Sequence, residues 1–253
     1  MTVPSFAARR KAWSSPPVDD IGYLPAKDML AMTDEGFAEL MLQFWNNRYG
    51  GWRNWQGKWV ETFGLWEGGI RDKRVLDYGC GVGMEGAQYA SLRNTVWLAD
   101  VSADNIAVAK RLFGLYGKQP EGTLLIKGDK APLSWVPPQP FDVIHCCGVL
   151  HHIPDPVPLV EAMAGWLTAG GRLNLMVYSD MAWRIAVGTD PPPDVTKDPR
   201  FDDFWTRWDP IGGYADWYNR ARLEERFGEW FTVETCLPLT QFGEYLGAVL
   251  VKR

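Results

Sequence analysis

The chain has 253 residues and a formal net charge of -5 at pH 7, and 46% of its residues are hydrophobic. This composition is normal for a globular protein, and the length fits one large domain, with or without a cap. The acidic balance provides no general positive field, so we expect neither nucleic acid nor a membrane surface as a partner. No run of 18 apolar residues occurs, so no membrane-spanning helix is predicted.

The cysteines give no sign of a disulfide framework or a metal site. Two of the four are adjacent, and none stands in a C-x-x-C pair. Reduced thiols in a cytoplasmic location fit this usage best. No apolar segment follows the basic run at residues 9–11, so no secretory signal is predicted. The cysteines are Cys80, Cys146, Cys147 and Cys236.

Residues 1–70 are expected to form a leader and a helical cap rich in aromatic residues. The leader, rich in proline and charge, extends to about residue 26, and apolar residues at helical spacing predict a helix over 29–45. A second aromatic stretch covers residues 52–66. Regular alternation of strands and helices begins after it, so we assign residues 71–253 to the main domain.

Strands and helices alternate from residue 74 onward at a spacing that predicts a parallel sheet with right-handed crossovers. A pair of glycines at 170 and 171 is expected to stop the third helix of this series. Two more strands close the chain with only a short link between them. The predicted strands are 74–78, 95–99, 124–127, 141–146, 172–178, 230–236 and 245–251, and the predicted helices are 84–92, 103–116 and 157–167.

Residues 179–229 interrupt this alternation. They contain three consecutive prolines at 191–193 and a predicted helix at 218–227. We interpret the segment as an insertion over the carboxyl ends of the strands, on the substrate side of the site.

The most informative segment is VLDYGCGVGMEG at residues 75–86. Gly79, Gly81 and Gly83 would let the backbone approach a ligand closely at the end of a strand. Asp77 would offer it a carboxylate. The glycine pattern leaves two classes of ligand possible at this point, because Gly81-x-Gly83-x-x-Gly86 formally satisfies the dinucleotide fingerprint. That fingerprint should begin directly at the strand end, however, and here it does not.

The pattern Asp-x-Gly-x-Gly-x-Gly from Asp77 to Gly83 resembles the first motif of the class I S-adenosylmethionine-dependent methyltransferases. The resemblance covers roughly residues 72–178. It implies an α/β fold with a doubly wound, seven-stranded, mostly parallel sheet and an antiparallel last strand. It also implies S-adenosyl-L-methionine as the cofactor and S-adenosyl-L-homocysteine as its product. No metal site is predicted.

Three acids stand at predicted strand ends, and the resemblance gives each a partner on the cofactor. Asp100 would accept from both ribose hydroxyls, Asp129 from the adenine amino group, and Asp77 would lie near the ammonium of the methionine moiety. The implied cofactor site comprises Asp77, Gly79, Cys80, Gly81, Gly83, Asp100, Val101, Asp129, Lys130, Cys147 and Gly148.

The segment FDVIHCCGVLHHIPDP at residues 141–156 resembles the fourth-strand motif of the same family. His151 and His152 follow the strand end, and the resemblance makes either one a candidate base for the acceptor's proton, with His151 preferred. His145 falls within the strand, so we expect a packed or hydrogen-bonded core histidine there.

The cap and the insertion are the aromatic regions of the chain. Of 14 tryptophans, six lie in residues 1–70 and five in 181–230. We expect most of these rings to form the core of the cap, and some to build an apolar pocket. Arg48 and Tyr49 are the cap residues expected to contact the cofactor. The substrate-side candidates are Tyr49, Trp52, Tyr178 and Trp183.

The function predicted from these motifs is transfer of a methyl group to an oxygen or nitrogen atom of a small molecule by in-line displacement. One alternative keeps the cofactor but cyclises its aminobutyrate moiety. Another is an NAD(P)-dependent oxidoreductase, and a fourth is a non-catalytic binding module. Nucleic acid methylation is disfavoured, because Cys-Gly-Val-Leu at 147–150 replaces Asn/Asp-Pro-Pro-aromatic and no Pro-Cys pair exists. We expect a monomer or a homodimer.

Overall fold

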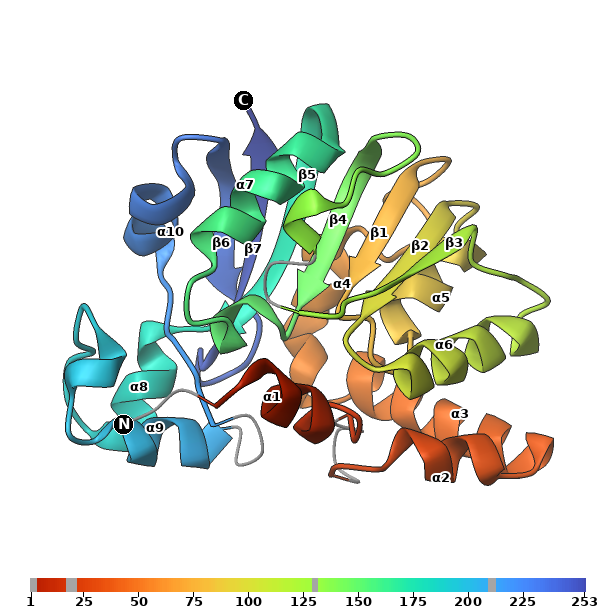
Figure 1. Cartoon of the computed structure of the whole chain (residues 1–253), viewed down its shortest axis with the longest axis horizontal. Helices are drawn as coiled ribbons and strands as arrows, with labels where there is room; N and C mark the ends of the chain where they lie inside the picture. The colour runs from red at the N-terminus through yellow and green to blue at the C-terminus, as the bar shows by residue number, and fades with distance from the viewer. Residues whose placement is uncertain (1–3, 17–21, 129–131, 209–212) are drawn as a thin grey trace.

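The computed structural model describes residues 4–16, 22–128, 132–208 and 213–253. A seven-stranded sheet forms its centre, with the strand order β3-β2-β1-β4-β5-β7-β6 (Figure 1). Strands β1 to β5 pair in parallel, and β7 is antiparallel to both β5 and β6, which confirms the predicted sheet. The strands are β1 Arg74–Tyr78, β2 Thr95–Asp100, β3 Gly122–Leu125, β4 Phe141–Cys147, β5 Leu167–Tyr178, β6 Phe231–Pro238 and β7 Tyr245–Lys252.

Helices cover both faces of the sheet. Because successive strand residues point to opposite faces, β1 contributes Val75 to one core and Leu76 to the other. The core around Val75 includes side chains of α5 and α6, and the core around Leu76 includes those of α7 and α10. These helices are α5 Met84–Ser91, α6 Ala103–Leu115, α7 Val157–Trp166 and α10 Arg220–Phe227, and short 3-10 helices occur at η3 Pro132–Ser134 and η4 Leu150–His152.

From residue 26 onward, the N-terminal region adds helices to the face that carries α5 and α6. The helix predicted over 29–45 is divided in two, because Met32 is extended and Thr33 caps a new helix by accepting from Gly36 N at 3.1 Å. The leader also contains a short helix that the sequence did not predict. The helices are α1 Phe6–Ala12, α2 Ala26–Ala31, α3 Asp34–Gly50 and α4 Lys58–Phe63, with the 3-10 helix η2 Trp52–Gly57 before α4.

Strand β5 begins earlier than predicted. Leu167 pairs with Phe141, so Gly170 and Gly171 lie inside the strand instead of stopping helix α7. The register shifts between Phe141 and Val143, and Gly170 has a φ of 67°. Glycine adopts a positive φ at this strand irregularity without steric cost. Glycine is also common at helix ends for the same reason, so the pair resembles a helix stop in the sequence.

The insertion after β5 forms a small core of its own. Its described elements are α8 Asp180–Val187, η5 Val195–Lys197 and α9 Phe201–Trp208. Trp183 and Phe204 are fully buried in this core, with ring centroids 5.0 Å apart. In Figure 1, α8 and α9 lie at the end of the sheet toward which the parallel strands point, and α1 lies beside them.

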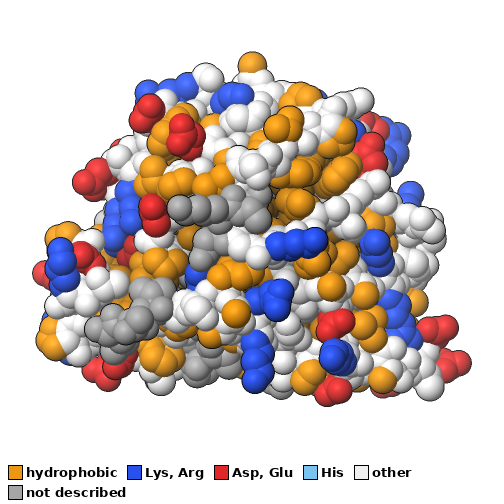
Figure 2. Space-filling model, in the orientation of Figure 1, with side chains coloured by type: hydrophobic (Ala, Val, Ile, Leu, Met, Phe, Trp, Pro, Cys, Tyr) orange, Lys and Arg blue, Asp and Glu red, His pale blue; other side chains and the backbone are white. Residues whose placement is uncertain are grey.

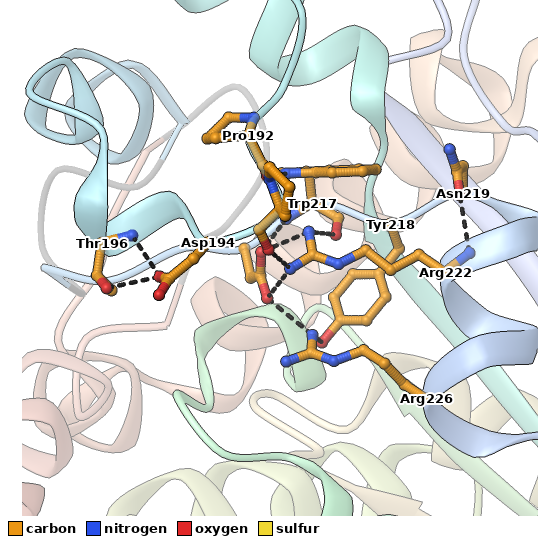
Figure 3. A network of polar contacts seen from close by, with 10 residues as sticks. Pro192, Asp194, Thr196, Trp217, Tyr218, Asn219, Arg222 and Arg226 are labelled. Carbon is orange, nitrogen blue, oxygen red and sulfur yellow. Dashed lines mark hydrogen bonds and ion pairs between the residues drawn. The ribbon is translucent and has the colours of Figure 1, made fainter.

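A buried ion-pair cluster fixes the end of the insertion. Arg222 and Arg226 reach from α10 to the carboxylate of Asp216, at 2.9 and 2.8 Å (Figure 3). Asp216 is only 2% exposed, and its backbone N–H donates to the carbonyl of His151 at 2.8 Å. The cluster therefore connects α10 to the loop that follows β4.

Replacing Asp216 with alanine is expected to lower the free energy of unfolding by about 3 kcal/mol. The change leaves two partly buried guanidinium groups without their anion, and that desolvation is then uncompensated. Urea unfolding followed by circular dichroism measures the loss. Asp203→Ala, at an exposed position of α9, is the control and should cost less than about 1 kcal/mol. Equal losses for both variants would contradict a stabilising role for the cluster.

Candidate active site

A cavity of about 590 Å³ lies at the carboxyl ends of β1, β2 and β4. Its volume is typical of small-molecule sites, and its position is the one at which doubly wound sheets bind their ligands. Eight of the predicted cofactor residues line it, namely Asp77, Gly79, Cys80, Gly81, Asp100, Val101, Cys147 and Gly148.

The remaining three predicted cofactor residues are placed differently. Gly83 is not among the lining residues; it precedes α5 with a φ of 81°, and a Cβ there would lie 2.5 Å from that of Ala109. Its glycine is thus required for packing between α5 and α6. Asp129 and Lys130 lie outside the described residues.

The glycine loop is held against the end of β2. Gly79 N and Cys80 N both donate to the carbonyl of Ala99, at 2.7 and 3.0 Å. A Cβ on Gly79 would lie 2.2 Å from a methyl group of Val149, and Gly79 has a φ of 75°. Only glycine satisfies both constraints, so the backbone itself forms this wall of the cavity.

Asp100, at the end of β2, is a buried carboxyl group held by three donors. Its Oδ2 accepts from Gly81 N at 2.9 Å, and its Oδ1 accepts from Ser102 N at 2.8 Å and Asn105 Nδ2 at 3.0 Å. Burial raises the pKa of Asp100 to about 6, because it outweighs these hydrogen bonds, which favour the anion. The orientation of the carboxyl group is therefore fixed before any ligand binds.

Affinity for the cofactor that the sequence predicts is expected to decrease as the pH falls below about 6. The anion of Asp100 accepts from a diol better than the neutral acid does, so binding favours the ionised form and releases a proton. Well below its pKa, the dissociation constant should rise by up to about tenfold per pH unit. Calorimetry with S-adenosyl-L-homocysteine between pH 5 and 7.5 tests this, and Asp100→Asn should show a shallower dependence. An affinity that is constant over this range would contradict it.

Acidic side chains and one arginine form the inner wall of the cavity. Asp77 accepts from Gly86 N at 3.0 Å, and burial together with the nearby carboxylate of Glu85 raises its pKa. Burial alone would raise the pKa of Glu85 as well, but its ion pair with Arg48 at 2.5 Å lowers it. Arg48 thus holds Glu85 as an anion, and the wall combines two carboxyl groups with one guanidinium group.

His145 is a core histidine, as expected, and it also lines the cavity. The hydroxyl of Tyr89 donates to the carbonyl of Phe63 at 2.7 Å, so its oxygen must accept from His145 Nδ1 at 3.3 Å. Burial lowers the pKa of His145 to about 4. The ring is therefore neutral, with its lone pair on Nε2, which has no hydrogen-bond partner among the described residues.

The structure brings His152 to the cavity wall, but not His151. His152 Nδ1 lies 3.0 Å from the carbonyl oxygen of Tyr214. A carbonyl only accepts, so Nδ1 carries a proton, and Nε2 is the ring atom that can act as a base. His151 packs instead against the ring of Tyr178, with centroids 4.1 Å apart, and burial lowers its pKa.

The four substrate-side candidates do not line the described part of the cavity. Trp183 is fully buried in the core of the insertion, and the hydroxyl of Tyr178 donates to the carbonyl of Trp208 at 3.1 Å. Trp52 is 43% exposed, with its ring 5.7 Å from that of Tyr245. Tyr49 packs on the ring of Trp45 at 4.3 Å. Tyr178 and Trp183 thus pack in the core of the insertion, while Tyr49 packs within α3 and Trp52 lies against β7.

Other residues of the cap line the cavity instead of these four candidates. They include residues of the leader, which the sequence did not identify as part of the site. Arg48, expected to contact the cofactor, is among them. From the cap these residues are Phe44, Arg48, Arg53 and Trp59, and from the leader they are Pro4, Ser5, Phe6, Arg9, Arg10, Trp13 and Pro16. The one local signal for the leader helix is Ser5, which caps α1 by accepting from Ala8 N at 3.3 Å.

The surface around the site carries charges of both signs. On the face seen in Figure 2, Lys and Arg side chains are interspersed with acidic and hydrophobic ones and form no continuous basic patch. Among the helices that the structure describes, none is long and apolar enough to cross a membrane.

A sheet with a reversed seventh strand, a glycine loop after β1 and an acid at the end of β2 define a class I methyltransferase fold with a site for S-adenosylmethionine. Residues 76–173 match a family model described as a methyltransferase domain. A ubiquinone biosynthesis O-methyltransferase of Xylella fastidiosa is 34% identical over 175 residues, which are 60% of this chain and 69% of the relative. The chain belongs to the S-adenosylmethionine-dependent methyltransferase family.

Further comparisons agree with this assignment. The enzyme of the same name from Xanthomonas euvesicatoria is 32% identical over 60% of this chain and 71% of its own length. The N-methyltransferase NodS of Bradyrhizobium japonicum, in complex with S-adenosyl-L-homocysteine, has a TM-score of 0.55 at 17% identity and covers 90% of this chain and 96% of its own. At 17% identity, the likeness to NodS concerns the fold alone. Family membership resolves the two interpretations of the glycine loop in favour of S-adenosylmethionine.

Proposed function

We propose that this methyltransferase methylates a hydroxyl oxygen of a small molecule. The observation that carries the proposal is the imidazole of His152 on the cavity wall, with its Nδ1 hydrogen-bonded to a backbone carbonyl, which leaves Nε2 as the atom that can accept a proton. A hydroxyl group must lose its proton during methyl transfer, and a positioned histidine suits that task. The names of the relatives, as O-methyltransferases, also support oxygen over nitrogen as the accepting atom.

The residues of the cavity fit the cofactor. Asp100 presents a carboxyl group held in place, the glycine loop leaves room where side chains would intrude, and the carboxyl groups of Asp77 and Glu85 would lie near the amino-acid end. When bound, S-adenosylmethionine supplies an electrophilic methyl group on a sulfonium. The chain then has to orient the acceptor, exclude water and hold the released proton on His152 Nε2.

Several features support a small acceptor over a macromolecule. The cavity is partly covered by the N-terminal residues, and the charge balance is acidic. In this proposal, residues 1–70 form the cap and 179–229 the substrate-side insertion of a main domain at 71–253. A cytoplasmic location and a monomeric or homodimeric state remain predictions from the sequence.

Product analysis tests the proposal. The purified protein is incubated with S-adenosylmethionine and a panel of small phenols, aliphatic alcohols and amines, and the products are identified by mass spectrometry. We expect S-adenosyl-L-homocysteine and an O-methylated product in equal amounts. Methylthioadenosine in place of S-adenosyl-L-homocysteine would indicate cyclisation of the cofactor, and methylation of amines alone would overturn the assignment to oxygen.

A further inference from the structure

Residues 4–16, here called the N-terminal strap, cross the carboxyl ends of the sheet and carry α1. Figure 1 shows α1 below the ends of the central strands, between the insertion and helices α2 and α3. Seven residues of the strap line the cavity, from Pro4 to Pro16. Because the strap forms one wall of the cavity, its position determines access to the site.

Trp13 connects the strap to both halves of the site. Its carbonyl accepts from Asn105 Nδ2 at 2.8 Å, and the same amide group donates to Asp100 Oδ1 at 3.0 Å. The ring of Trp13 packs against the ring of His152. Their centroids are 4.8 Å apart, and the two ring planes are tilted by 44°. One residue thus contacts the partner of the ribose-binding acid and the imidazole of the proposed base.

Apart from these contacts, Phe6 of the strap packs, partly buried, against the core that contains side chains of α7 and α10. Helix α1 has seven residues, and none of them is buried. A helix of this length is marginal in water unless it is packed against something else. The carboxyl end of the strap is anchored, because Ala26 N donates to Ser14 O at 3.1 Å and Leu24 N to Pro16 O at 3.3 Å. Because α1 has no fully buried residue, residues 4–13 are expected to open locally before the core does.

We infer that Trp13 is a positioning residue for His152, and that residues 4–13 close over the cofactor when Asp100 is engaged by the ribose. This inference rests on the proposed function insofar as His152 is the base. The carboxylate of Asp100, already oriented by the protein, holds the amide of Asn105, and that amide holds the carbonyl of Trp13, so a ribose bound to Asp100 joins the same network. The indole ring then limits the movement of the imidazole and keeps water from it.

The closure is tested without any acceptor. Arg9, Arg10 and Lys11 are three consecutive trypsin sites within α1. Local opening exposes them, so saturating S-adenosyl-L-homocysteine should slow cleavage there by about tenfold in the full-length protein. Cleavage of Asp100→Asn at the same concentration of ligand should be slowed much less. A cleavage rate that does not respond to S-adenosyl-L-homocysteine would overturn the closure.

The role of Trp13 is tested by kinetics. Trp13→Ala should lower kcat about tenfold or more, because a misplaced base loses alignment, while the dissociation constant of S-adenosyl-L-homocysteine changes by less than about threefold. Trp13→Phe keeps an aromatic ring and should restore most of kcat. Trp66→Ala, at a half-exposed tryptophan outside the lining of the cavity, is the matched control and should leave kcat unchanged.

The outcomes separate this inference from the proposed function. If Trp13→Ala weakens the binding of S-adenosyl-L-homocysteine by as large a factor as it lowers kcat, Trp13 does not position the base. The same conclusion follows if Trp13→Phe does not restore kcat. If His152 proves dispensable for catalysis, the proposed base fails and so does the positioning role. The protection of α1 by S-adenosyl-L-homocysteine is independent of both results, because no methyl transfer takes place in that measurement.

Discussion

Asp100→Asn is expected to weaken the binding of S-adenosyl-L-homocysteine by about 30- to 1,000-fold. Each charge-assisted hydrogen bond contributes about 1.5–3 kcal/mol, and the substitution removes the charge from the two bonds that we propose between Asp100 and the ribose diol. It also places an NH2 group among donors, because both carboxylate oxygens already accept from Gly81, Ser102 and Asn105. Calorimetry at pH 7.5, where the wild-type carboxyl group is ionised, measures the change.

The matched control is Asp104→Asn, which removes the same charge from the first turn of α6, close to Asp100 but outside the lining of the cavity. Its affinity should remain within about twofold of wild type, because a surface charge contributes little to a contact it does not make. Equal affinities of wild type and Asp100→Asn would show that the acid at the end of β2 does not hold the ribose.

The sheet could be predicted because its signals are local. The run VLDY ends in a glycine loop whose conformation depends on its own residues, and each strand end carries its acid within the same short segment. Parallel strands then bring Asp77 and Asp100 to one edge, so the sequence order of the motifs determines their placement. Eight of the eleven predicted cofactor residues consequently line the cavity.

The cover of the site could not be predicted in the same way. Trp13 is placed by a hydrogen bond to Asn105, 92 residues away, and no local pattern in the leader encodes that contact. Aromatic content indicated a cap, but a tryptophan that fills a core and one that lines a cavity have the same composition signal. Trp183 and Trp59 illustrate this, since both are buried and only Trp59 lines the cavity.

The two histidines after β4 could not be distinguished by sequence either. They are adjacent, and both belong to the 3-10 helix η4. Contacts with the insertion place the two histidines differently. Asp216 N donates to the carbonyl of His151, whereas the carbonyl of Tyr214 accepts from the ring of His152. Their different roles thus depend on a segment more than 60 residues further along the chain.

His152→Asn is expected to lower kcat by about 100- to 10,000-fold and to leave the affinity for S-adenosyl-L-homocysteine nearly unchanged. The amide NH2 of asparagine can still donate to the carbonyl of Tyr214, as Nδ1 does now, so the loop should keep its position. What the variant loses is the basic Nε2, and the range is the usual contribution of a general base. Turnover with a hydroxyl acceptor, compared with calorimetry on the same samples, measures the two effects separately.

His151→Phe is the control that distinguishes the neighbouring ring. Phenylalanine keeps an aromatic ring against Tyr178 and has no basic nitrogen, so kcat should fall by less than about tenfold if His151 only packs there. A loss as large as that of His152→Asn would instead identify His151 as the base, as the sequence first suggested. A full rate in His152→Asn would mean that the acceptor loses its proton without help from this histidine, and the cavity wall would then serve binding alone.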